Sequence, residues 1–134
     1  MANTKKFSEG TKIVIVEDDK LLGGLLSKMF TYEGCNIVYI ESGEKVQAMV
    51  EAEAPNLILL DLLLPGMNGF DVLVNLKKNS KTKDIPVVIL SCLGEKAEIK
   101  RGLGLGAVNY LIKATVTVED IINEVSAIIQ KINN

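Results

Sequence analysis

The sequence predicts an α/β protein in which helices cover both faces of one parallel sheet. Apolar runs of strand length alternate along the chain with segments whose apolar residues follow a helical period. Polar or charged residues stand directly after these runs, where the strands should end. Such alternation implies right-handed crossovers and a three-layer, doubly wound (βα)5 fold. The expected strand order is 2-1-3-4-5.

The first elements follow a lead that we expect to be flexible, residues 1–11, so that the domain spans residues 12–134. The first strand is Lys12–Val16. The next helix begins near Asp19, a suitable N-cap, and ends at Gly34. Its apolar positions, spaced as on a helix, are Leu21, Leu22, Leu25, Leu26, Met29 and Phe30.

The middle of the chain predicts a strand at residues 36–40 and a helix at 44–52, which stops ahead of Pro55. A third strand covers residues 56–61. Residues 62–69 contain Pro-Gly and Asn-Gly pairs and are therefore a loop in spite of their leucines. The remaining elements, in the order helix, strand, helix, strand and helix, are expected at residues 70–78, 86–91, 95–105, 108–112 and 118–132.

Composition excludes several functions. The net charge of −2 gives no sign of a nucleic-acid surface. No apolar run reaches the roughly 20 residues of a membrane span, and the polar N-terminus lacks a signal-peptide core. Histidine is absent, which excludes histidine metal ligands and catalytic bases. Cys35 and Cys92 lack metal-ligand spacing, so we expect reduced thiols in a cytoplasmic protein, with Cys92 partly buried.

Charged and polar residues mark the predicted strand ends. Glu17 and Asp18 follow the first strand and Asp61 the third, while Ser91 ends the fourth and Lys113 follows the fifth. The carboxyl ends of parallel strands share one edge, so these groups should converge in one crevice. An all-oxygen site suits a hard divalent ion such as Mg²⁺. A metal, an ammonium and a hydroxyl around one carboxylate would stabilise a transferred phosphoryl group.

Across residues 12–132 the chain resembles the receiver domain of two-component response regulators. The resemblance implies a flavodoxin-like fold, and we expect no effector domain in this chain. The motifs that carry it are Val16-Glu17-Asp18-Asp19, Leu60-Asp61-Leu62-Leu63-Leu64-Pro65-Gly66-Met67-Asn68-Gly69, Ile89-Leu90-Ser91, Gly106-Ala107 and Tyr110-Leu111-Ile112-Lys113.

The resemblance implies a role for each matching residue of the acidic site. Asp61 matches the phosphoacceptor, and Asp18 matches a direct Mg²⁺ ligand. Glu17 matches a ligand that acts mainly through water, and the backbone carbonyl of Leu63 matches a further protein ligand.

The remaining matches concern the phosphoryl group and the output. Ser91 and Lys113 match the groups that hold phosphoryl oxygens, and Tyr110 matches an aromatic switch that follows Ser91. The implied partners are a sensor histidine kinase or a histidine phosphotransfer protein. A downstream protein would bind the face formed by the fourth helix, fifth strand and fifth helix, without direct contact to nucleic acid or membrane.

Three departures from the family pattern matter. Ala114 stands where the family usually has proline, and a cis Lys113–Ala114 bond would cost about 2.5–4 kcal/mol, so the sequence leaves the isomer open. Leu63 and Leu93 flank the site with apolar side chains that cannot activate water, which predicts a long-lived phosphoryl state. Val108 replaces an acid common in receivers of transcription factors, and we expect it to face the core.

Two other functions remain open at this point. The chain could be an adaptor that has lost phosphorylation, in which case Asp61 merely pairs with Lys113. It could also be an aspartyl-phosphate phosphatase or phosphotransferase. Such enzymes usually need a second acid two residues after the nucleophile, where Leu63 stands. We therefore expect a protein that catalyses only its own phosphorylation and slow dephosphorylation.

Overall fold

A computed structural model describes residues 6–133 of the chain. One parallel sheet has the strand order β2-β1-β3-β4-β5, which confirms the predicted topology. The strands are β1 (Lys12–Val16), β2 (Asn36–Ile40), β3 (Leu57–Leu60), β4 (Val87–Ser91) and β5 (Asn109–Ile112).

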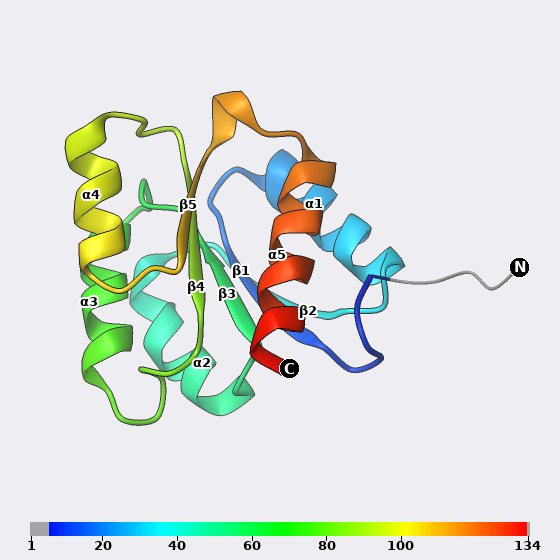
Figure 1. Ribbon diagram of the computed structural model, residues 1–134. Coiled ribbons are helices and arrows are strands. Elements are labelled where there is room, and N and C mark those ends of the chain that lie inside the picture. The colour runs from blue at the N-terminus through cyan, green and yellow to red at the C-terminus, as the bar shows by residue number, and fades with distance from the viewer. Residues whose placement is uncertain (1–5, 134) are drawn as a thin grey trace, which may run out of the picture.

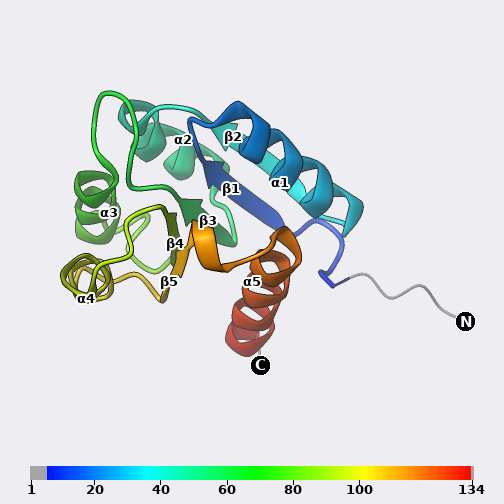
Figure 2. The ribbon, with the colours of Figure 1, turned by 90° about the horizontal axis from the view of Figure 1, so that it is seen from above.

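Helices cover both faces of this sheet, with α1 and α5 on one side and α2, α3 and α4 on the other (Figures 1 and 2). Their positions agree with the predicted ones to within two residues, except that the second helix opens as a 3-10 turn. The helices are α1 (Lys20–Tyr32), α2 (Val46–Glu53), α3 (Gly69–Lys78), α4 (Lys96–Gly104) and α5 (Val118–Asn133), with 3-10 turns η1 (Gly43–Lys45) and η2 (Lys113–Thr115).

The sheet separates two hydrophobic cores. Along β1, Val14 and Val16 face the core beneath α2 and α3, whereas Ile13 and Ile15 face the core beneath α1 and α5. Successive side chains of a strand point to opposite faces, so a strand covered on both sides must be apolar throughout. All residues of β3 are buried, which places this strand at the centre of the fold.

Local signals fix the helix starts that matter for the site. Asp19 caps α1 as predicted, because its carboxylate accepts hydrogen bonds from the N–H groups of Leu21 and Leu22. Asn68 caps α3 by accepting from Asp71 N–H. Each cap satisfies backbone donors that would otherwise lack partners at the first turn. The residues after β1 and β3 are thereby held beside the sheet edge.

Residues 6–11, predicted to belong to a flexible lead, pack against the domain instead. Phe7 is only 7% exposed, and its ring lies 5.7 Å from the ring of Phe30 on α1, measured between centroids. The Ser126 hydroxyl of α5 donates to the Lys6 carbonyl at 3.0 Å. A single aromatic residue carries no periodic signal, which explains the error. The rest of the predicted lead, residues 1–5, lies outside the described residues.

Two predictions of side-chain burial, for Val108 and Cys92, were wrong. Val108 is 50% exposed, because it precedes the first residue of β5 and the alternation of that strand does not extend to it. Cys92 is exposed. Leu21 and Leu25 follow the helical period but lie on the outer side of α1, with Leu21 86% exposed. The apolar stripe of this helix is wider than the face that the sheet covers.

We expect Phe7→Ala to lower the free energy of unfolding by about 3 kcal/mol, because it removes a buried ring and leaves a cavity. Urea denaturation followed by circular dichroism would measure the change. Leu21→Ala is the matched control, since Leu21 is exposed, and it should change stability by less than about 0.5 kcal/mol. Equal stability of Phe7→Ala and wild type would show that residues 6–11 are not part of the folded domain.

Candidate functional site

The acidic residues predicted from the strand ends do converge. Asp61 N–H donates to the Val16 carbonyl at 3.0 Å, which places the end of β3 beside the end of β1. One carboxylate oxygen each from Glu17, Asp18 and Asp61 lies within 4.8 Å of the other two. Glu17 and Asp61 are almost fully buried, at 1% and 2% exposed, while Asp18 is exposed. The three residues form one cluster of carboxylates.

Lys113 brings a positive charge to the two buried carboxylates. Its Nζ lies 2.9 Å from Glu17 Oε1 and donates hydrogen bonds to Glu17 Oε2 at 3.0 Å and Asp61 Oδ2 at 3.1 Å. The peptide bond to Ala114 is trans, since residues 6–133 contain no cis bond. The ammonium therefore reaches the site without the proline that the family usually has at this position.

Backbone donors hold the two buried carboxylates from the other side. Asp19 N–H donates to Glu17 Oε2 at 3.1 Å, and Leu63 N–H donates to Asp61 Oδ1 at 3.2 Å. Hydrogen bonds to charged acceptors are stronger than those between neutral groups, so they fix the orientation of both side chains. Residue types do not reveal these donors, because every residue except proline carries the same N–H group.

The electrostatics of the site remain unbalanced. Burial raises the pKa of Glu17 from 4.5 to about 7, and the charge of Asp61 adds to this shift, while Lys113 and the Asp19 N–H oppose it. Burial alone would lower the pKa of Lys113, but its bonds to Glu17 and the charge of Asp61 outweigh that effect and raise it. Lys113 thus stays charged, and one ammonium faces three carboxylates.

These residues fit a hard divalent cation. Glu17 Oε1 is buried and accepts no hydrogen bond, although Lys113 Nζ lies near it. A buried carboxylate oxygen without a donor is costly, and a cation would remove that cost. The donor set consists of oxygen atoms alone, with neither nitrogen nor sulfur, as magnesium-type ions prefer.

Ser91 and Tyr110 lie on the β4–β5 side of the site and meet at one peptide group. The buried Ser91 hydroxyl accepts from Leu93 N–H at 3.1 Å, and the Tyr110 hydroxyl donates to the Leu93 carbonyl at 2.6 Å. Burial raises the pKa of Tyr110, against the effect of the nearby Ser91 hydroxyl. The Tyr110 ring therefore already faces the interior, and Ser91 is bonded to its own loop.

The two leucines predicted to flank the acceptor differ in exposure. Leu63 is 51% exposed in the loop after β3, and Leu93 is partly buried against the core. The sequence analysis considered both side chains and the Leu63 carbonyl, but neither of the two N–H groups nor the Leu93 carbonyl. The structure adds that the peptide groups of both residues bond to the site, through Asp61 for Leu63 and through Ser91 and Tyr110 for Leu93.

Comparison with known proteins agrees with this geometry. Residues 13–126 match the family described as the response regulator receiver domain. The chain is a member of that family. It is 33% identical over 108 residues to the phosphate regulon transcriptional regulatory protein PhoB of Rhizobium meliloti, covering 81% of this chain and 48% of that protein. The match to the DNA-binding regulator RpaA of Synechocystis is 34% over 120 residues, covering 90% and 49%. The receiver chain thus spans about half the length of these relatives.

Solved receiver structures share the fold. The BeF3-activated N-terminal receiver domain of Klebsiella pneumoniae RstA superposes with a TM-score of 0.81 at 27% identity, covering 88% of this chain and 97% of that one. The Mn²⁺-bound form of the response regulator Rcp1 has a TM-score of 0.72 at 29% identity, covering 88% and 91%. The receiver is a signalling module, and none of the helices in residues 6–133 has the length and apolarity required to cross a membrane.

With divalent metal removed by a chelator, we expect Glu17 to make the receiver less stable as the pH rises from about 4.5 to 7. The folded receiver keeps the Glu17 proton up to about pH 7, whereas the unfolded chain releases it near 4.5. Between about pH 4.5 and 7 the folded state therefore binds more protons than the unfolded chain. The stability that the Glu17 proton contributes is fully present below this range and is lost above it.

Urea denaturation at several pH values would compare wild type with Glu17→Gln. The difference between the two free energies of unfolding should change by roughly 3 kcal/mol across the range, because the Glu17 pKa rises from 4.5 to about 7 and each pKa unit corresponds to about 1.36 kcal/mol. Parallel profiles for the two proteins would contradict the raised pKa.

Proposed function

We propose that this receiver is a phosphorylation-dependent switch that accepts a phosphoryl group on Asp61 from a sensor histidine kinase or a histidine phosphotransfer protein. The observation that carries the proposal is the buried Asp61 carboxylate, placed within reach of two further carboxylates and bonded to Lys113. A structural salt bridge would not need three carboxylates around one ammonium. The adaptor alternative is therefore not favoured.

In the proposed transfer, an Asp61 oxygen attacks phosphorus and forms an acyl phosphate, while the bond to the donor imidazole nitrogen breaks and histidine leaves with its electron pair. Lys113 bonds the free Asp61 carboxylate and would bond the phosphoryl oxygens after the transfer. The Ser91 hydroxyl would donate a hydrogen bond to these oxygens. Bound Mg²⁺, held by Asp18, Asp61 and the Leu63 carbonyl with Glu17 acting mainly through water, would offset the negative charge of the donor. The Mn²⁺-bound structure of the response regulator Rcp1 supports a metal role in this receiver.

The structural effect of phosphorylation at Asp61 would be transmitted through Ser91 and Tyr110. Turning the Ser91 hydroxyl toward a phosphoryl group breaks its bond from Leu93 N–H, and the Leu93 carbonyl is the partner of Tyr110. Movement of this peptide would change the surface of α4, β5 and α5, where a downstream protein would bind. We propose a cytoplasmic location and no direct contact of this receiver with nucleic acid, although its relatives are DNA-binding regulators.

Incubation with a small-molecule phosphodonor and Mg²⁺ should add one phosphoryl group to the protein, observed by intact mass. Asp61→Asn should remain unmodified, because an amide cannot serve as the nucleophile. Chelation of the metal should also prevent the increase. An unmodified wild-type protein would support the adaptor function instead, and sustained hydrolysis of an external phosphate ester would support an enzyme.

The phosphorylated receiver should lose its phosphoryl group slowly, because the apolar side chains of Leu63 and Leu93 neither orient nor activate water. Leu63→Asn and Leu93→Glu should each speed the decay. Leu93→Glu should do so by up to about 100-fold if its carboxylate acts as a general base, and Leu63→Asn by less, because an amide can orient water but cannot take its proton. Decay would be followed by intact mass after removal of the donor. Leu103→Asn, an exposed leucine on α4, is the control and should decay like wild type. Equal or slower decay of the first two variants would contradict this prediction.

A further inference from the structure

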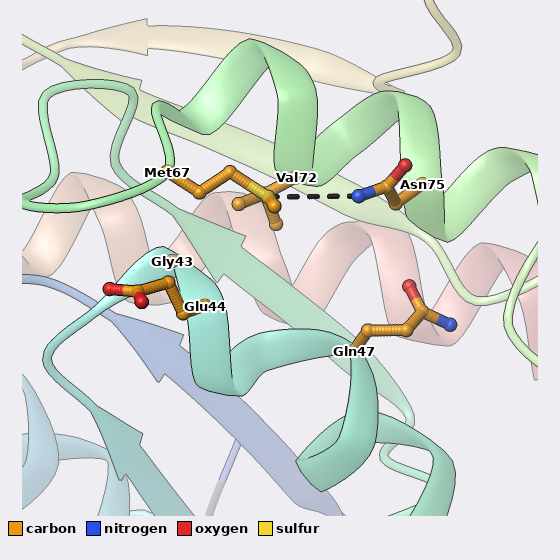
Figure 3. A pocket seen from close by; sticks show the side chains of 6 residues that line it. All are labelled: Gly43, Glu44, Gln47, Met67, Val72 and Asn75. Atoms are coloured by element: carbon orange, nitrogen blue, oxygen red, sulfur yellow. Dashed lines mark hydrogen bonds between the residues drawn. The ribbon is translucent and has the colours of Figure 1, made fainter.

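The β2–α2 turn packs against the loop that follows Asp61. The turn enters η1 at Gly43, and the loop runs through residues 62–68 to the start of α3. Figure 3 shows Gly43 on one side of this contact and Met67 and Val72 on the other. Gly43, Met67 and Val72 line one small pocket between the two segments. The two segments lie in direct contact at Gly43, as the distances from its missing Cβ show.

Gly43 is required here because of space. A Cβ at this position would lie 2.2 Å from the Met67 carbonyl oxygen and 3.1 Å from Val72 Cγ2. Gly43 is not among the residues with positive φ, so its backbone conformation is open to other residues. The atom nearest to the missing Cβ belongs to the backbone and cannot rotate away as the end of a flexible side chain could. Any side chain at residue 43 would displace either the loop or the turn from its position.

The loop that rests on Gly43 also carries groups of the proposed site. Leu63 N–H donates to Asp61 Oδ1 at 3.2 Å. At the far end of the loop, Gly69 N–H donates to the Leu62 carbonyl at 2.8 Å. The start of α3 thus holds one end of the loop. The β2–α2 turn holds the loop at Met67, through the contact with Gly43. A displacement at Met67 would be transmitted along a short chain to the Leu63 peptide.

We propose that Gly43 is a positioning residue: it lets the β2–α2 turn hold the loop so that the Leu63 peptide is correctly placed beside Asp61. This inference rests on the proposed function, in which the Leu63 carbonyl and Asp61 help to bind Mg²⁺. Gly43 acts through the position of Leu63 alone.

Calorimetric titration of the metal-free protein with Mg²⁺ alone tests this role. Gly43→Ala should raise the dissociation constant about 10-fold or more, as expected when support behind a metal ligand is lost. Gly24→Ala is the neutral control, because no atom lies within 4 Å of its Cβ position. Gly102→Ala is the overpacked control, since its Cβ would meet Ile89 Cδ1 at 2.5 Å under α4. Both controls should keep wild-type affinity for Mg²⁺, even where Gly102→Ala lowers stability.

An unchanged dissociation constant for Gly43→Ala, beside normal binding by wild type, would overturn this inference alone. Failure of wild type to bind Mg²⁺ would overturn the proposed function as well. A second measurement needs no variant and covers the case in which Gly43→Ala does not fold. In wild type, Mg²⁺ should shift the amide resonance of Gly43 together with that of Leu63, while the resonance of Gly104 stays fixed. A Gly43 resonance that does not move would refute the coupling.

Discussion

Two buried carboxylates, Glu17 and Asp61, share one ammonium group at the carboxyl edge of the sheet. Burying a carboxylate is costly unless it is paired and hydrogen-bonded. Lys113 compensates this cost only in part, since the pKa of Glu17 remains raised and its Oε1 accepts no hydrogen bond. The site is therefore electrostatically incomplete. A divalent cation bound there would supply the missing charge. In the proposed function, the charge-compensated carboxylate would then meet an anionic phosphoryl donor.

The topology makes this interaction possible. Neighbouring positions of β1 and β3 in the sheet bring Glu17 and Asp61 together, although the two residues are far apart in the chain. Lys113 comes from beyond β5, two strands away from β3, and only a long side chain can span that distance. The central strands β1, β3 and β4 can be buried on both faces because their inner residues are apolar, so their polar groups are confined to the ends. The fold thus concentrates the charge of the molecule's interior at one edge.

Peptide groups give the site its rigidity. The N–H groups of Asp19 and Leu63 hold the buried carboxylates, and the Leu93 peptide joins Ser91 to Tyr110. Close packing sets these peptide groups in place, as the contact between Gly43 and the Met67 carbonyl illustrates. In the proposed switch, a change at Asp61 would reach the α4–β5–α5 surface through such contacts because packed segments shift together.

The order of elements, the parallel sheet and the residues that meet at its edge can be predicted from the amino-acid sequence alone. Apolar runs, helical periods and turn residues act locally, so Asp18, Asp61 and Lys113 could be placed from the strand ends alone. The sequence does not reveal the burial of Phe7, the exposure of Val108 and Leu21, the trans bond after Lys113 or the backbone donors around Asp61, which become visible in the folded protein. These depend on which surfaces other segments cover and on distances between distant peptide groups. Residue type does not encode such distances, because every peptide group has the same chemistry until the fold places it.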